Sequence, residues 1–336
     1  TGTLGSSTLG NLELKMEENS RLFISPNVKL NLSEAIGQNL FGNVQGAPTF
    51  SSDSSEKYSA NLLFKSELKI DEAVNLDNNG DTYKNLEISN SSIINENSVT
   101  GTKANQIFIA QENGDTNKAY VTLVNETGKN INLSGAESLA IYGKNGYIIN
   151  KGNIEMAGDS ATAIYGTGLS TIKNESSAKI ILKGKKSLGL YYKNTSGGVT
   201  EEKLKNEGSI ELLGDKQVAM TYEPNELHSS LSSGTENLFL NEGEIKISGN
   251  NSVAMYAKKD KNDIGYFTLN KGKIISGVPA RKSSVGMYTD AEKNKLINEL
   301  DGEIETSDLG NGIFGYDIEN KGKIKVNKDG IGIYSK

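Results

Sequence analysis

The chain contains no cysteine and no tryptophan, and it has only four prolines among its 336 residues. Without cysteine it can form neither a disulfide framework nor a cysteine-ligated metal site. A thiol-free chain can also cross an oxidising compartment unfolded without being trapped by disulfides, although chance loss of cysteine is the alternative explanation. The few prolines, set against 37 glycines, indicate many tight turns and few rigid linkers.

Arginine is almost absent, since only Arg21 and Arg281 occur. The net charge is −6 and the two signs are interspersed, so the chain has no basic stripe of the kind that binds nucleic acid. The scarcity of arginine also weighs against recognition of phosphate groups. We therefore expect no nucleic-acid partner.

Long apolar runs are absent as well. No segment approaches the ~18 residues that a membrane helix needs, and no signal peptide opens the chain. The last residues, 331–336, stop in the middle of a repeat. We expect that the sequence is a fragment truncated at both ends, with any export signal or membrane anchor outside it.

An internal repeat is what the sequence does contain. The block Asn-x-Gly-x-Ile recurs at intervals of 22–35 residues, and the shortest intervals set a basic coil of 22–25 residues. Repeats of this length are typical of solenoids, in which each repeat buries its apolar face against its neighbours. The clear copies begin at Asn150, Asn206, Asn241, Asn270 and Asn320, and looser copies begin at Asn125, Asn174 and Asn298.

Each coil holds three short apolar runs that mostly alternate with polar residues, as in Ile245 and Ile247 or Val253 and Met255. Alternation with a period of two indicates a strand with one buried face. Turn residues separate the runs, and no segment shows the 3.6-residue period of a leucine-rich repeat helix. The sequence therefore predicts an all-β right-handed parallel β-helix, a β-solenoid with three short strands per coil and loop insertions on one edge.

The recurrent asparagine is predicted to form a polar ladder, because stacked coils place equivalent side chains ~4.8 Å apart. We expect the glycine two positions later to adopt a positive φ. The residue after that glycine alternates in charge through Glu244, Lys273, Glu303 and Lys323, which favours a parallel register of one coil. Chance in a surface rich in lysine and glutamate is the alternative. The predicted ladder consists of Asn150, Asn174, Asn206, Asn241, Asn270, Asn298 and Asn320.

The repeat divides the chain into two parts. Residues 121–336 hold the regular coils. Residues 1–120 hold degenerate coils, among which Asn95 is a degenerate anchor, and segment 33–60 does not repeat and is interpreted as an irregular insertion.

Most extra residues fall between the tyrosine near the end of one strand and the next strand, at 193–203, 223–237, 258–265 and 289–295. Such insertions emerge from one edge of a solenoid, where binding loops usually lie. Variable turns without a ligand are the alternative. The predicted binding residues on this loop edge are Asn194, Thr195, Asn225, Glu226, His228, Lys259 and Arg281.

Motifs for catalysis and metal binding are weak. His228 is the single histidine, so neither a multi-histidine metal site nor a catalytic triad can be argued. The segment from Asp77 to Asp81 resembles a calcium loop, but its glycine is misplaced and Ile88 stands where a glutamate is needed, so a plain turn is favoured. We expect no metal and no cofactor.

Polysaccharide lyases and glycosidases need clustered carboxylates. Glu207 and Glu242 lie at equivalent positions of adjacent coils, but the next copy is Lys271, which indicates ordinary surface variation. The recurring tyrosines could form an exposed stripe that stacks on sugars, but a packed ladder is favoured. These tyrosines are Tyr142, Tyr165, Tyr191, Tyr256, Tyr288 and Tyr334.

The repeat Asn-x-Gly-x-Ile, followed after a spacer by Gly/Ala-Ile/Met-Tyr, resembles the passenger domains of type V autotransporters. With abundant lysine, asparagine and isoleucine, the chain is most similar to the large fusobacterial autotransporter adhesins. The resemblance covers about residues 120–336. It implies a location at the cell surface, outer-membrane-anchored or extracellular, with membrane contact only through a C-terminal β-barrel absent from this fragment.

The resemblance also implies attachment to a glycan or protein receptor on host or bacterial cells. We therefore predict a non-enzymatic, monomeric surface adhesin passenger. A carbohydrate-active β-helix enzyme, either lyase or glycosidase, and a purely structural stalk are the alternatives.

Overall fold

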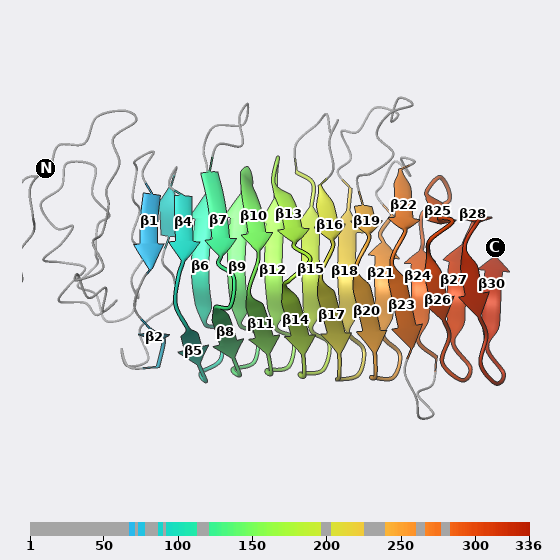
Figure 1. Cartoon of the computed structure of the whole chain (residues 1–336), viewed down its shortest axis with the longest axis horizontal. Helices are drawn as coiled ribbons and strands as arrows, with labels where there is room; N and C mark the ends of the chain where they lie inside the picture. The colour runs from blue at the N-terminus through green and yellow to red at the C-terminus, as the bar shows by residue number, and fades with distance from the viewer. Residues whose placement is uncertain are drawn as a thin grey trace, which may run out of the picture.

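The computed structural model describes residues 67–70, 73–77, 87–89, 92–112, 121–195, 203–224, 239–259, 266–276 and 283–336. Within these ranges the chain forms strands and no helix, and the strands stack in three parallel ten-stranded sheets (Figure 1). Neighbours in each sheet are three strands apart along the chain, so one coil contributes one strand to every sheet. The predicted right-handed parallel β-helix with three strands per coil is confirmed.

We name the sheets A, B and C in the order in which the chain visits them within a coil. Sheet A contains β1 (Glu67–Ile70), β4 (Ser92–Asn95), β7 (Val121–Asn125), β10 (Gly146–Asn150), β13 (Thr171–Asn174), β16 (Leu204–Asn206), β19 (Phe239–Asn241), β22 (Phe267–Asn270), β25 (Lys295–Asn298) and β28 (Asp317–Asn320). Sheet B contains β2 (Val74–Asn75), β5 (Val99–Gly101), β8 (Asn130–Leu133), β11 (Asn153–Met156), β14 (Lys179–Leu182), β17 (Ser209–Leu212), β20 (Glu244–Ile247), β23 (Lys273–Ser276), β26 (Glu303–Glu305) and β29 (Lys323–Lys325). Sheet C contains β3 (Glu87–Ser89), β6 (Ile107–Glu112), β9 (Leu139–Lys144), β12 (Thr162–Thr167), β15 (Leu188–Lys193), β18 (Val218–Glu223), β21 (Val253–Ala257), β24 (Val285–Thr289), β27 (Asn311–Gly315) and β30 (Ile331–Ser335).

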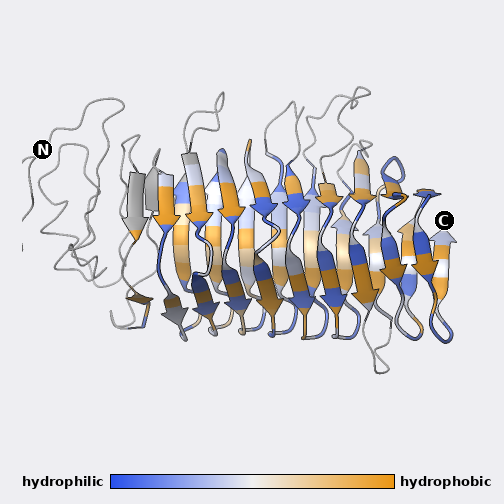
Figure 2. Cartoon of the chain, viewed as in Figure 1, coloured by the Kyte–Doolittle hydropathy of each residue, from blue (hydrophilic) through white to orange (hydrophobic). Residues whose placement is uncertain are grey.

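The core is a set of aliphatic columns that run along the rod. In sheet B, for example, Ile154, Ile180, Ile210 and Ile245 are paired in register, and none is exposed. The hydropathy of the strands alternates along their length, as the predicted period of two requires (Figure 2). Each fully buried side chain of this size contributes about 1.5–3 kcal/mol relative to an exposed one, so the columns are the main source of stability.

The repeated asparagines occupy the corner between sheets A and B, which we call the A–B corner. From one coil to the next, the side-chain Nδ2 of each asparagine donates to the Oδ1 of its neighbour at 2.7–2.9 Å. All of them are buried except Asn320 in the last coil. The ladder runs through Asn95, Asn125, Asn150, Asn174, Asn206, Asn241, Asn270, Asn298 and Asn320.

The glycine two residues after the asparagine was predicted to adopt a positive φ, and this prediction is wrong. The glycines with positive φ in the described chain are Gly128 and Gly168, which lie elsewhere. At Gly243 a Cβ atom would overlap the carbonyl oxygen of Gly208 in the preceding coil, and at Gly272 it would overlap that of Gly243. Glycine is required here because the coils approach too closely for any side chain.

Positive φ occurs instead at the corner between sheets B and C, and there it falls on residues that are not glycine. Nine coils of the described chain place one such residue at this corner, with φ between 54° and 61°. A left-handed conformation costs an ordinary residue roughly 1–2 kcal/mol, so the sheets on either side must enforce this turn. The residues are Asn105, Glu137, Ser160, Lys186, Lys216, Asn251, Ser283, Leu309 and Asp329.

The predicted charge alternation on the outer face of sheet B is confirmed by the strand register. Glu244 pairs with Lys273, Lys273 with Glu303, and Glu303 with Lys323. Both lysines lie 3.7 Å from a carboxylate oxygen of Glu303. Like charges are therefore kept apart in this column, which would otherwise be destabilised.

The first described strands belong to the same three sheets as the rest. Strands β4–β6 pair in parallel with β7–β9, so these coils belong to the same three sheets as the coils that follow. The irregular insertion predicted at 33–60 lies outside the described residues. No helix in the described part of the chain is long and apolar enough to span a membrane.

Candidate functional site

The A–B corner has two turn lengths, and the difference creates a recess on the surface. Ser209 begins its strand three positions after Asn206, whereas Lys179 begins its strand five positions after Asn174. The coils of Asn206, Asn241 and Asn270 all have the short turn. The coils of Asn174 and Asn298, on either side, have the long turn. Three short turns therefore lie between two turns with extra residues.

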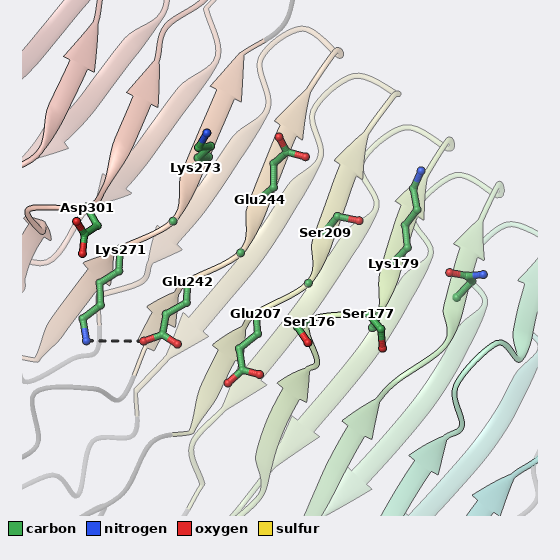
Figure 3. Close-up of a pocket in the computed structure, with 15 residues that line it drawn as sticks. Ser176, Ser177, Lys179, Glu207, Ser209, Glu242, Glu244, Lys271, Lys273 and Asp301 are labelled. Atoms are coloured by element: carbon green, nitrogen blue, oxygen red, sulfur yellow. Dashed lines mark ion pairs between the residues drawn. The ribbon is translucent and has the colours of Figure 1, made fainter.

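The recess is an open trough of about 610 Å³ (Figure 3). Its floor is Gly208, Gly243 and Gly272, which have no side chains because of the close coil contact. The long turns supply Ser176, Ser177 and Ala178 at one end and Asp301 at the other. Two rows of polar side chains, which run side by side along the rod, form the walls. Glu207, Glu242 and Lys271 lie on the side of sheet A, and Lys179, Ser209, Glu244 and Lys273 lie on sheet B.

The carboxylates on the sheet A side form an ion-pair network. Lys205 Nζ lies 3.0 Å from both the Glu207 and the Glu242 carboxylates, so it bridges two coils. Lys173 approaches Glu207 at 3.1 Å, and Lys271 lies 3.8 Å from Glu242, as the dashed line in Figure 3 marks. On the other wall, Lys246 lies 2.6 Å from Glu244. Each wall carboxylate thus has a cationic neighbour.

This network keeps Glu207 ionised. Partial burial acts to raise the pKa of Glu207, but hydrogen bonds from Lys205 and Lys173 outweigh it and hold the pKa below its usual value. A glycosidase needs one carboxyl group that stays protonated near neutral pH to act as the acid. The pKa of Glu207 is shifted in the opposite direction, so Glu207 is suited to accepting hydrogen bonds rather than to donating a proton.

The trough can therefore offer fixed donors and acceptors to a polar ligand. Ser176 and Ser177 lie at one end, and Ser209 lies on the next coil. Carboxylates line the middle, and Lys271 and Lys273 lie near the far end. In the residues that the structure describes, no group of three or more histidine, aspartate or glutamate side chains could hold a metal ion. The long turns flank the three short ones, and the lining also includes Asn153 on the coil beyond the turn that carries Ser176 and Ser177.

The predicted binding residues on the loop edge fall only partly within the described chain. Thr195 is exposed, and its hydroxyl lies 3.3 Å from the hydroxyl of Thr167. Lys259 is also exposed, and its backbone N–H donates to Asp290. Asn194 is only 2% exposed, so its side chain is not presented to a partner. These residues follow β15 and β21, two coils apart at the same corner, and they do not form a cluster.

The other four predicted binding residues, Asn225, Glu226, His228 and Arg281, lie outside the described residues.

The recurring tyrosines form an outward row on sheet C that is half-buried by mutual packing. Tyr142, Tyr165 and Tyr191 follow one another with ring centroids 5.4 and 4.9 Å apart. Thr221 interrupts the row, because it pairs with Tyr191 on one side and Tyr256 on the other. The row then continues through Tyr256, Tyr288, Phe314 and Tyr334, with centroids 4.8–5.4 Å apart.

Asp77, the first residue of the segment that resembles a calcium loop, has a structural role. Its carboxylate accepts hydrogen bonds from the backbone N–H groups of Thr102 and Lys103 and from the side chain of Gln106. Burial acts to raise the pKa of Asp77, but these hydrogen bonds lower it overall. Asp81 lies outside the described residues, so the calcium loop itself is not described.

The sequence analysis considered Glu207 and Glu242 as a carboxylate pair, with Lys271 as the next copy, but it did not predict the trough. The available signal was the number of residues between each ladder asparagine and the next strand, because that spacing separates short turns from long ones. A buried aromatic cluster was also missed: Tyr192, Tyr222, Phe239 and Tyr266 pack together inside the rod. The tyrosine pair at 191–192, in which one side chain points out and the next points in, was its signal.

Comparison with known families gives one match. Residues 51–275 match the family model described as the BigA third pectate lyase-like domain, a bacterial surface-protein domain. No curated protein matches the chain, and no solved structure does either. The match covers all of the trough lining except Asp301, the loop-edge segments up to residue 265, and the tyrosine row up to Tyr256.

Proposed function

The chain belongs to the family of the BigA third pectate lyase-like domain, and from this membership and the trough we propose that it is a non-catalytic binding domain of a bacterial surface protein. In this proposal the domain is part of an autotransporter passenger that serves attachment. Its ligand is a short, polar segment of a glycan or protein receptor on another cell. The fusobacterial adhesin subtype stays a prediction from the resemblance alone.

One observation carries the proposal. The trough is lined by serine, glutamate and lysine side chains, and its central carboxylates lie within ion-pair distance of lysines. A carboxylate with a lowered pKa, as at Glu207, binds hydroxyl, amide or ammonium groups through charge-assisted hydrogen bonds. It does not supply the protonated acid that glycoside hydrolysis requires.

The test is ligand identification followed by substitution within the trough. The purified protein would first be screened on glycan and protein arrays, and its affinity for each ligand found would be measured by calorimetry. Ser209→Arg fills the middle of the trough from an outward position of β17 without touching the core. We expect it to weaken binding at least about tenfold, a loss of ~1.4 kcal/mol.

Asn132→Arg is the matched control. Asn132 is an exposed residue of sheet B in β8 and does not line the trough. We expect ligand affinity to be unchanged in this variant. If Ser209→Arg binds as tightly as the parent, the trough is not the binding site. Replacing Asn225–Thr235 with a short Gly-Ser turn then tests the loop edge.

A carbohydrate-active enzyme is the second candidate, because the matched family is described as pectate lyase-like. Incubation with acidic and neutral polysaccharides, followed by detection of unsaturated products and of new reducing ends, distinguishes the two. Cleavage that Glu207→Gln or Glu242→Gln abolishes would replace the binding proposal with a catalytic one.

A further inference from the structure

The outer face of sheet C differs from that of sheet B. Outward positions of sheet B are mostly charged, whereas sheet C presents two half-buried rows that are mainly apolar. One is the tyrosine row, and the other lies at the start of the same strands. The second row consists of Leu139, Thr162, Leu188, Val218, Val253 and Val285.

A charged row borders the tyrosines, two residues further along each coil. After Glu112, which pairs with Lys144, its central part along the rod is Lys144, Thr167, Lys193, Glu223, Lys258 and Asp290. Within the chain, the Glu223 carboxylate lies 2.9 Å from Lys193 Nζ and 2.7 Å from Lys258 Nζ. The signs along the row are therefore positive, neutral, positive, negative, positive and negative.

This order is self-complementary when the row is read backwards. We infer that the outer face of sheet C is an interface with a second copy of this chain, with the two rods antiparallel. The two-fold axis runs along the strand direction between β15 and β18. Surfaces related by such an axis must be complementary to themselves, since the same patch appears on both sides.

In this arrangement each row faces its own counterpart in reverse order. Lys144 then faces Asp290 of the second copy, and Lys193 faces Glu223, so opposite charges meet at both positions. In the tyrosine row, Tyr191 of one copy lies opposite Thr221 of the other, which is buried in its own chain. The apolar row meets itself as well, with Leu188 opposite Val218.

Other arrangements of the two faces are less favourable. Sliding one rod by one coil places Lys144 opposite Lys258 and Lys193 opposite its own symmetry mate, and like charges at an interface are strongly unfavourable. Turning one rod end for end, so that the rods are parallel, places the charged row against the leucine and valine row. That would bury charges without partners. The charge order thus selects both direction and register.

The partner is therefore a second copy, held mainly by apolar contact and aligned by charge. This inference goes beyond ligand binding in the trough, which lies at the A–B corner and not on sheet C. It also departs from the monomer expected from the sequence.

Sedimentation equilibrium of the purified chain over a range of concentrations is the first test, and a reversible dimer is expected. Lys193→Glu should raise the dimer dissociation constant at least about tenfold, because it opposes Glu223 of the second copy. The double variant Lys193→Glu/Glu223→Lys restores opposite charges between positions 193 and 223, both within and between chains, although position 223 then repels Lys258. It should recover part of the lost affinity. Lys183→Glu breaks a similar ion pair, with Glu155, away from sheet C and should leave the dimer unchanged.

Cysteine pairs test direction and register separately, since the chain has no cysteine of its own. Lys144→Cys/Asp290→Cys should give a covalent dimer with a bifunctional thiol reagent whose spacer is about 10 Å, the distance between packed sheets. The two positions are five coils apart within one chain, ~24 Å at the sheet spacing, so the reagent cannot join them within one chain. The single variant Lys144→Cys places its two thiols five coils apart in the dimer and should not crosslink. A chain that is monomeric at every concentration, or efficient crosslinking of the single Lys144→Cys variant, would overturn the inference.

Discussion

The side-chain amide of Asn206 donates a hydrogen bond to Oδ1 of Asn241 at 2.8 Å, and neither side chain is exposed to solvent. The Oδ1 of Asn206 in turn accepts from Asn174 at 2.7 Å. A buried polar group is costly when it lacks a partner, so each ladder asparagine is held by its neighbours on both sides.

We predict that Asn206→Ala lowers the free energy of unfolding by ~1–3 kcal/mol, because it leaves the Asn174 amide and the Asn241 oxygen without their ladder partners. Asn153→Ala is the matched control, since Asn153 donates a similar hydrogen bond to Asn130 at 2.9 Å on the exposed face of sheet B. Its expected cost is ~0.5 kcal/mol or less. Urea unfolding followed by circular dichroism measures both, and equal losses would contradict a special role for burial.

Gly243 is predicted to tolerate no side chain. Gly243→Ala places a Cβ against the carbonyl oxygen of Gly208 and should destabilise the fold by ~1–3 kcal/mol through forced backbone shifts. Gly128 has a positive φ of 75° with open space around it, and Gly128→Asn should change stability by no more than ~0.5 kcal/mol, because asparagine tolerates this conformation. Thermal unfolding of the two variants separates close approach from backbone conformation.

At the corner between sheets B and C, substitutions should change stability according to how well the new residue adopts a positive φ. Lys216 has a φ of 58°, and its side chain is exposed. Lys216→Val should cost ~1–2 kcal/mol because a β-branched residue resists the left-handed conformation. Lys216→Asn should be neutral or stabilising. If the valine and asparagine variants have the same free energy of unfolding in urea, the left-handed conformation at position 216 does not determine which residues are tolerated there.

The lowered pKa of Glu223 predicts that the protein loses stability in acid. Burial acts to raise the pKa of Glu223, but hydrogen bonds from Lys258, Tyr191 and Lys193 dominate and lower the pKa from the usual 4.5 to about 2. The folded state therefore binds the proton less readily than the unfolded state. The stabilisation is complete above about pH 4.5 and is lost as the pH falls toward 2.

The measurement is the melting temperature of the parent and of Glu223→Gln at pH 6 and at pH 3. At pH 6 the parent should be the more stable of the two. The difference should shrink at pH 3, because Glu223 is then mostly protonated in the unfolded state. A difference that does not depend on pH would show that the lysine and tyrosine contacts contribute nothing through the charge of Glu223.

Much of the architecture was predictable from the sequence because the repeat imposes it. The alternation of Ile245 and Ile247 predicted the buried face of a strand. The charges of Glu244, Lys273 and Glu303 predicted the register between neighbouring coils. The asparagines were recognisable because a buried amide that must bond to its own copy tolerates few replacements. These features depend on residues that recur once per coil.

The features that escaped prediction depend on relations between coils rather than on the repeat itself. The backbone conformation of Gly243 is ordinary, and its need for glycine comes from the carbonyl of Gly208 one coil away. The positive φ at Lys216 falls on a residue type that gives no signal in sequence. The trough arises from the contrast between the turn after Asn206 and the turn after Asn174, so neither turn alone reveals it.

The asparagine ladder also gives the rod an electrical direction. Every amide in it points its N–H toward the C-terminal neighbour and its oxygen toward the N-terminal one. Reversing a single amide would set two oxygens face to face on one side and two NH2 groups on the other, so the orientation of one fixes that of all. Hydrogen bonds aligned in this way polarise one another. The column therefore acts as a chain of aligned dipoles running the length of the described coils, with a polarity independent of the charged surface.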